Sequence, residues 1–160
     1  MNVRVGHGFD VHPFDRSGER PLILGGLEFA DSLGLAGHSD ADVVTHAVID
    51  ALLGAAALGD IGTHFSDEDA RWQGADSLAM LQQTVEMVRA AGWHPGNVDC
   101  TVIAEAPKLA PRRAEMEARL TAAVGAPVTI KAKRAEGLGA LGRAEGIACF
   151  AVAIVSSEHG

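Results

Sequence analysis

The sequence predicts an α+β fold, a two-layer sandwich in which a four-stranded, mainly mixed sheet carries helices on one face. Strand-like and helix-like segments alternate along the chain, with no internal repeat and no low-complexity linker. The run Ile147–Val155 is almost entirely apolar and partly β-branched, which is typical of a buried central strand. A length of 160 residues predicts one domain over residues 1–160.

The N-terminal half of the chain supplies a strand, a hairpin and a helix. Residues 2–9 have the pattern of a strand, and residues 21–29, with two adjacent glycines inside, predict two short strands or a bulged hairpin. Apolar residues at helical spacing predict a helix over residues 40–58. Residues 59–75 are rich in Gly and Asp and predict a loop.

The C-terminal half repeats this alternation of helices and strands. Residues 76–91 predict an amphipathic helix, and residues 98–104 alternate in the way of a half-buried strand. A third helix is expected from Pro111 to about Val124, followed by a short strand over residues 127–132. A glycine-rich loop over residues 137–146 then leads into the apolar run.

Composition excludes several classes of function. The net charge of −8 and the absence of a Lys/Arg stripe disfavour nucleic-acid binding, although an anionic small ligand stays open. The apolar run Ala51–Leu58 is too short to span a membrane, and Met1 leads into no signal peptide. Cys100 and Cys149 have no metal-binding spacing and are expected as buried free thiols. We therefore expect a cytoplasmic protein with no membrane partner.

The run Gly-His-Gly-Phe-Asp-Val-His at residues 6–12 carries a candidate metal site. In a strand, Asp10 and His12 project to one side, whereas His7, Phe9 and Val11 face the other. A carboxylate and an imidazole can share one zinc ion, and His46 offers a third ligand.

His46 falls inside the predicted helix over residues 40–58. Ser39, three residues before Asp42, indicates a helix start of the capping-box type. Asp42 and Asp50 lie one turn either side of His46, so either of them is a candidate to hold its second ring nitrogen. A single histidine in an alanine-rich helix is more commonly a core or surface residue, and that alternative stays open.

Several loops carry groups suited to phosphate. The segments 60–62 and 104–108 offer backbone amides next to charged side chains. Lys133, Arg134 and Glu136 are suited to a diphosphate and a divalent ion, or form an exposed charged turn. For the acidic run 65–69 a solvated turn is the favoured interpretation.

Together these segments resemble the family of 2-C-methyl-D-erythritol 2,4-cyclodiphosphate synthases. The resemblance covers nearly the full length in the right order. It is carried by the runs GHGFDVH (6–12), GHSDADVVTHAVIDALLGAAALGDIG (37–62), GADS (74–77), NVDCTVIAEAPKL (97–109) and LGRAEGIA (141–148).

The resemblance implies a phosphorus–oxygen lyase of the non-mevalonate route to isoprenoid precursors. Such enzymes convert 4-diphosphocytidyl-2-C-methyl-D-erythritol 2-phosphate to 2-C-methyl-D-erythritol 2,4-cyclodiphosphate and release CMP. They are homotrimers with active sites between neighbouring subunits, so the sheet is expected to assemble as a trimer around a central apolar cavity. The implied cofactors are zinc on Asp10, His12 and His46, and a second divalent ion, magnesium or manganese, at Glu136.

The resemblance also assigns residue roles, position by position. His38 and Arg134 are the expected catalytic residues, residues 104–110 match the cytidine-binding segment, and Arg143 and Glu145 match residues near the threefold axis. The implied substrate contacts are Asp10, Val11, His12, His38, Ser39, Asp60, Ile61, Gly62, Phe65, Ser66, Asp67, Glu68, Asp69, Ala104, Glu105, Ala106, Pro107, Lys108, Leu109, Ala110, Lys133, Arg134, Ala135, Glu136, Ala140 and Arg143.

The chain departs from the family pattern most at Lys133-Arg134, where the family commonly has Thr-Thr. One of those threonines contacts the diphosphate, so Arg134 either neutralises phosphate charge or turns outward to solvent. There are four smaller departures. Ala41 and Ala144 stand where the family usually has Gly, Ser66 stands where it has Pro, and Ala140 stands where it has an aromatic residue.

Two other functions use the same residues. A metal-dependent phosphohydrolase would take water as nucleophile at the same ligands. A nucleotide-binding oligomer without activity would keep residues 104–108 and use zinc only structurally. The reaction product separates the three: CMP without free phosphate, free phosphate, or neither.

Overall fold

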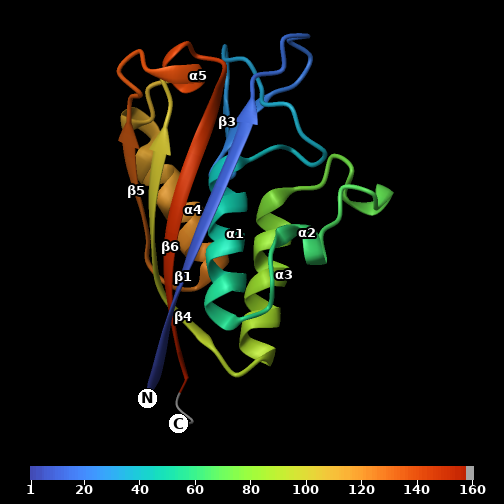
Figure 1. Ribbon diagram of the computed structural model, residues 1–160, viewed down its shortest axis with the longest axis vertical. Helices are drawn as coiled ribbons and strands as arrows, with labels where there is room; N and C mark the ends of the chain where they lie inside the picture. The colour runs from blue at the N-terminus through green and yellow to red at the C-terminus, as the bar shows by residue number, and fades with distance from the viewer. Residues whose placement is uncertain (158–160) are drawn as a thin grey trace.

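The computed structural model describes residues 1–157 and places four strands in one mixed sheet (Figure 1). The order across the sheet is β1 (Asn2–Pro13), β6 (Gly146–Ser157), β4 (His94–Ile103) and β5 (Val128–Lys133). β6 is antiparallel to both of its neighbours, whereas β4 and β5 are parallel. The expected four-stranded mixed sheet is confirmed.

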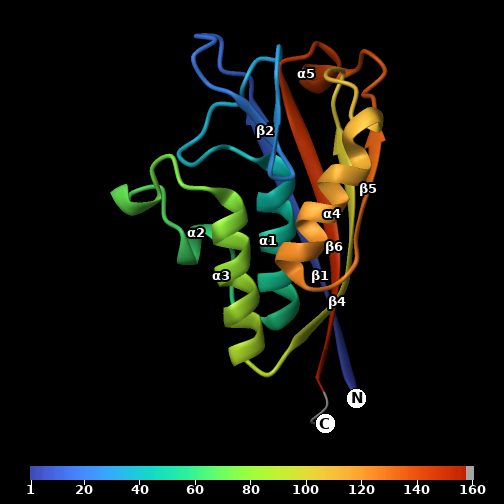
Figure 2. The same ribbon diagram turned by 180° about the vertical axis from the view of Figure 1, so that it is seen from behind.

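Three long helices cover one face of this sheet, as the two opposite views show (Figures 1 and 2). They are α1 (Val43–Ala56), α3 (Ser77–Ala90) and α4 (Arg113–Val124). The predicted hairpin is formed by β2 (Leu22–Leu24) and β3 (Leu27–Phe29). No helix within residues 1–157 is long and apolar enough to cross a membrane.

Two segments expected to be loops contain short helical elements. α2 (Ile61–His64) and the 3₁₀ turn η1 (Ala70–Trp72) interrupt residues 59–75. Two of the aspartates in this predicted loop are N-caps of these elements. Asp60 accepts from Thr63 N at the start of α2, and Asp69 accepts from Arg71 N at the start of η1. Likewise α5 (Gly139–Gly142) lies in the glycine-rich loop, and η2 (Ala110–Arg112) precedes α4.

The core lies between the helices and the inner face of the sheet, and two glycines of β1 set its closest approach. A Cβ at Gly6 would lie 1.9 Å from Ala51 O, and one at Gly8 would lie 1.9 Å from Ala47 O. Only glycine therefore allows the backbone of α1 to rest on β1. Asp10 continues the same inward-facing row, which brings it to the start of α1.

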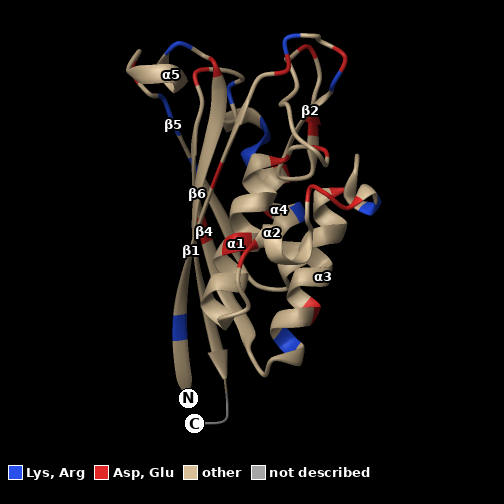
Figure 3. Cartoon of the chain, turned by 45° about the vertical axis from the view of Figure 1, so that its right-hand side comes forward, with Lys and Arg blue, Asp and Glu red and all other residues tan. Residues whose placement is uncertain are grey.

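The outer face of the sheet is apolar and exposed over β1 and β6 in the single chain. β6 is central, as predicted, but it is buried on one side only: Phe150, Val152 and Ile154 are 39%, 42% and 36% exposed. We call the outer apolar face the set Val3, Val5, Phe9, Val11, Phe150, Val152 and Ile154. Figure 3 shows the charged residues mainly in loops at the end of the sheet where β1 finishes. Cys100 and Cys149 are buried free thiols, as expected.

Candidate functional site

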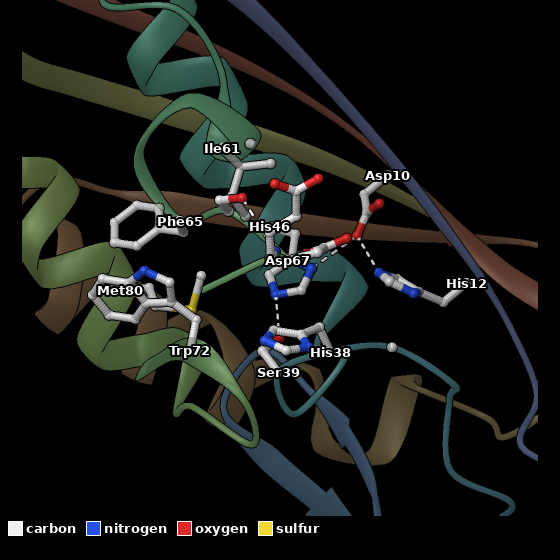
Figure 4. A pocket seen from close by; sticks show the side chains of 14 residues that line it. Asp10, His12, His38, Ser39, His46, Ile61, Phe65, Asp67, Trp72 and Met80 are labelled. Atoms are coloured by element: carbon white, nitrogen blue, oxygen red, sulfur yellow. Dashed lines mark hydrogen bonds and ion pairs between the residues drawn. The ribbon is translucent and has the colours of Figure 1, made fainter. Parts of the chain in front are cut away.

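Three side chains of the predicted ligand set meet at the C-terminal end of β1. Asp10 and His12 project from β1, and His46 projects from the first turn of α1, all toward one point (Figure 4). Asp10 Oδ2 lies 2.9 Å from His12 Nε2 and 3.0 Å from His46 Nδ1. One ligand atom from each residue lies within 4.8 Å of the others, so this group could hold a metal ion.

Both imidazoles have their far nitrogens engaged by protein groups. His12 Nδ1 lies 2.8 Å from the carbonyl oxygen of Ala36, which can only accept, so this nitrogen carries the proton. His46 Nε2 lies 2.8 Å from Ser77 Oγ, and the Ser77 hydroxyl donates to Asp40. Ser77 therefore accepts from Nε2–H of His46. With the far nitrogens so engaged, His12 Nε2 and His46 Nδ1 are the nitrogens that face Asp10 and could serve as metal ligands.

The support of His46 corrects two expectations. Ser39 Oγ and Ser77 Oγ contact its second nitrogen, rather than Asp42 or Asp50. Asp42 is itself the N-cap of α1, accepting from Val44 N and Thr45 N, and it also binds the amides of the β2–β3 turn. Asp50 accepts from Ile61 N and so anchors α2. Both carboxylates are therefore occupied with backbone amides.

Electrostatics within the ligand group favour an ionised carboxylate. Burial alone would raise the pKa of Asp10, but hydrogen bonds from His12 and His46 outweigh it and hold that pKa well below its usual range. Burial alone would lower the pKa of His12, but the hydrogen bond and charge of Asp10 outweigh burial, so the pKa of His12 is raised above its usual value. Without a metal, a proton on His12 thus takes the place of a cation beside Asp10.

The ligand group opens into a cavity of about 440 Å³ that we call the metal cavity. No Lys or Arg is among its lining residues. His38 stands at its wall with Nε2 3.3 Å from Asp69 O, and Phe65 packs edge-on against Trp72, with ring centroids 4.9 Å apart. The lining residues are Asp10, His12, Gly37, His38, Ser39, His46, Ile61, Gly62, Phe65, Ser66, Asp67, Glu68, Trp72 and Met80.

A second hollow of about 210 Å³, the edge pocket, lies between the loops that follow β4 and β5. Arg134 Nη2 donates to Glu105 Oε2 at 2.8 Å, and Ala135 N donates to Glu105 Oε1 at 2.8 Å. Glu105 thereby ties the two loops together. The lining residues are Ala104, Glu105, Pro107, Lys108, Leu109, Ala110, Ala132, Lys133 and Arg134.

The metal cavity and the edge pocket lie at the same end of the sheet but near opposite edges. Asp10 pairs with Cys149 on β6, Cys149 pairs with Val102 on β4, and Val102 pairs with Ala132 on β5. Three strand spacings therefore separate the β1 and β5 edges, about 14 Å in total. Within one chain the two sites do not merge.

Several residues expected to contact substrate do not line either hollow. The side chain of Val11 is on the outer face, Asp60 caps α2, and Arg143 contacts Glu145. The others outside both linings are Asp69, Ala106, Ala135, Glu136 and Ala140.

Sequence reasoning missed the other wall residues of the metal cavity, Gly37, Trp72 and Met80. It also missed the support that Ser77 and Asp40 give to His46. Ser77 lies in the run GADS, which marked the segment but not its contact.

Comparisons with known proteins place this geometry in a family. A sequence model of the YgbB family matches residues 3–156. A relative from Bordetella petrii named 2-C-methyl-D-erythritol 2,4-cyclodiphosphate synthase is 55% identical over 161 residues, with 98% of each chain covered.

Solved structures agree. IspF of Plasmodium falciparum in a CDP complex is 28% identical with a TM-score of 0.84, and the match covers 99% of this chain and 98% of that one. The bifunctional IspDF from Campylobacter jejuni is 36% identical with a TM-score of 0.92. That match covers 98% of this chain but 42% of the other, so this chain spans less than half the length of the bifunctional protein.

Proposed function

The chain belongs to the YgbB family of 2-C-methyl-D-erythritol 2,4-cyclodiphosphate synthases, and on that premise we propose that it converts 4-diphosphocytidyl-2-C-methyl-D-erythritol 2-phosphate to the 2,4-cyclodiphosphate and CMP. An oxygen of the 2-phosphate forms a bond to the β-phosphorus. The bond from that phosphorus to the bridging oxygen breaks, and CMP leaves with this oxygen. No protein nucleophile is needed because the attacking phosphate is already an anion, so positioning and charge neutralisation carry the catalysis.

The observation that carries this proposal is the ligand group at the floor of the metal cavity. Asp10, His12 and His46 provide one oxygen and two nitrogens, the donor set of a catalytic zinc with an open fourth position. The far nitrogens of both imidazoles are already bound, as they are in zinc proteins. Zinc held there would supply a Lewis acid that polarises a phosphate oxygen.

A second ion, magnesium or manganese, would be held by Glu136 together with oxygens of the substrate. Magnesium commonly binds through one or two carboxylates and phosphate oxygens, so a single protein ligand is sufficient. Glu136 has a positive φ of 54° and follows the loop that Glu105 holds through Ala135 N. The side chain therefore leaves a fixed backbone next to the edge pocket.

The edge pocket is the proposed seat of the cytidine. Its walls are mostly small or apolar side chains and backbone, which suits a flat base read through main-chain groups. Lys108, Lys133 and Arg134 bring three cations to its mouth, where the diphosphate would follow. His38 and Ser39 would bind the phosphates from the metal cavity, and residues 60–62 the methylerythritol part.

We propose further that each active site joins the metal cavity of one subunit to the edge pocket of its neighbour in a homotrimer. Two observations support this arrangement. The two hollows lie near opposite edges of one sheet. The outer apolar face, with the Phe9 and Phe150 rings 4.8 Å apart, exposes large side chains that a partner copy would cover.

The reaction product tests the activity. Purified protein with zinc and magnesium should release CMP from the proposed substrate and form no free phosphate. Free phosphate would indicate a phosphohydrolase, and neither product would indicate a binding protein; both outcomes contradict the proposal. The control is His94→Ala, an exposed histidine at the far end of β4, which should behave as wild type.

Mixing two inactive variants tests the shared site. His46→Ala removes a metal ligand, and Ala132→Trp fills the edge pocket. After dissociation and reassembly together, mixed trimers should regain activity because some sites combine an intact cavity with an intact pocket. No recovery, in mixtures shown by light scattering to contain mixed trimers, would mean that each site lies within one chain.

A further inference from the structure

Arg20 lies behind the wall of the metal cavity and forms hydrogen bonds with the backbone of the wall segment, residues 37–39. Its Nη1 donates to the carbonyl oxygen of Gly37 at 2.6 Å, and its Nη2 donates to the carbonyl oxygen of Ser39. The loop between these carbonyls carries His38. A third cavity, of about 450 Å³, opens on the Arg20 side of this loop, so the loop separates the two hollows.

The direction of these carbonyls fixes the direction of the neighbouring amides. In a planar trans peptide the C=O and N–H groups point to opposite sides, so the His38 N–H points away from Arg20. The His38 carbonyl is held by Gly74 N at 2.8 Å, which orients the Ser39 N–H in the same manner. Within residues 1–157 neither of these two amides donates to a protein acceptor. They are available as donors at the wall of the metal cavity.

Arg20 also brings a positive charge close to the metal cavity. The lining of the metal cavity holds Asp10, Asp67 and Glu68 but no Lys or Arg, although the proposed substrate is a polyanion. The guanidinium of Arg20 is partly buried, its hydrogen bonds go to backbone carbonyls, and its charge also acts on the nearby carboxylate of Asp15. Its charge-assisted bonds also polarise the peptides that they hold, which strengthens the amides as donors.

We propose that Arg20 is a positioning residue for phosphate binding: it holds Gly37–Ser39 so that the amides of His38 and Ser39 face the substrate phosphate, and it supplies the positive charge behind them. This inference rests on the proposed function for the identity of the anion. Arg20 does not contact the ligand group itself, but it holds the backbone of Ser39, whose hydroxyl supports His46, so zinc content is measured separately.

The test compares Arg20→Ala and Arg20→Lys with Arg112→Ala. Arg112 also donates to a backbone carbonyl, that of Glu28, but lies outside both hollows. Three quantities are measured: bound zinc, the Kd of inorganic diphosphate for zinc-loaded protein by calorimetry, and kcat and KM for CMP release. The diphosphate titration needs no turnover, so it judges Arg20 even if wild type releases no CMP and the proposed function fails.

Arg20→Ala should keep wild-type zinc content, weaken diphosphate binding about tenfold, and lower kcat/KM about 10- to 100-fold. Guanidinium ion at a non-denaturing concentration should restore part of the activity, and Arg20→Lys should lie between. Arg112→Ala should match wild type. Diphosphate binding within twofold of wild type in Arg20→Ala would overturn the proposal. The proposal would also be overturned if Arg20→Ala lost diphosphate binding together with zinc, and if neither guanidinium ion nor the Arg20→Lys substitution restored that binding. If Arg20→Ala does not fold, the same criteria apply to Arg20→Lys.

Discussion

The metal cavity and the edge pocket lie at one end of the same sheet, yet they are built from different kinds of structure. The ligands of the metal cavity stand on β1 and α1, and buried hydroxyls support them. The edge pocket is formed by loops after β4 and β5 and held by the pair of the exposed Arg134 with the largely buried Glu105. The first region therefore depends on core packing, whereas the second depends on contacts that solvent screens.

The largest effect is expected from the ligand group. Replacing His46 by Ala removes one of the three predicted ligands, so zinc binding and turnover should both be lost. Because such an ion contributes several kcal/mol, we expect a fall in kcat of about 1,000-fold or more. Metal content and CMP release measure the result. Full activity in zinc-free His46→Ala protein would contradict the assignment, and circular dichroism should show that the fold survives.

The packing beneath the ligands gives the second prediction. A methyl group at Gly8 would overlap Ala47 O, so Gly8→Ala should push α1 from β1 and cost about 1–3 kcal/mol of unfolding free energy. Gly54→Ala is the matched control, because its Cβ would meet nothing nearer than 3.9 Å and alanine favours a helix. Denaturant unfolding should show opposite signs for the two variants. An equal, small change in both would mean that the close approach does not matter.

Strand periodicity predicts that two of the three candidate ligands lie on the same side of β1, whereas it says nothing of the third. A period of two placed Asp10 and His12 on one side of β1. His46 was a candidate by its residue type, because α1 is buried on nearly all sides and its apolar pattern does not assign His46 to one face. The support could not be predicted, since Ser77 follows His46 by 31 residues and meets it only through tertiary packing.

The loops were harder to predict, for a related reason. Arg20 donates to backbone carbonyls, and every residue has one, so the sequence does not reveal which carbonyls it binds. The sequence predicted that the apolar run of β6 is buried. It did not show that one side of this strand lies on the outer apolar face, because an apolar run does not reveal whether another chain covers it.

Ser77 gives the third prediction. Its Oγ accepts from His46 Nε2 and donates to Asp40, so Ser77→Ala should weaken zinc binding about tenfold. The effect is at the low end for such a contact because Ser39 Oγ also lies 3.0 Å from the same nitrogen. Thr84→Val removes another buried hydroxyl of α3 that bonds only Met80 O, and it should leave zinc affinity unchanged. Competition with a chelator measures both. Equal affinities for Ser77→Ala and wild type would remove Ser77 from the site.

The smallest effect is expected at the pair of Arg134 with Glu105. The Arg134 hydrogen bond holds the pKa of Glu105 below its ordinary value, so Arg134→Thr should let that pKa rise. Because the folded pKa is depressed, the stabilising contribution is present above the ordinary pKa of glutamate. It is lost as the pH falls through the folded value. Carbon NMR titration of Glu105 measures the shift, which should shrink at high salt because Arg134 is 69% exposed.

Turnover decides what this pair does in the edge pocket. Arg134 donates through Nε and Nη2, which leaves Nη1 for a phosphate oxygen at the pocket mouth. If Arg134 neutralises the diphosphate, Arg134→Thr should raise KM a few-fold and increase the dependence of the rate on magnesium. Lys131→Thr is the control, since it breaks another exposed pair on β5, with Asp99, outside the pocket. An unchanged magnesium dependence in Arg134→Thr would show that the arginine only ties the two loops together.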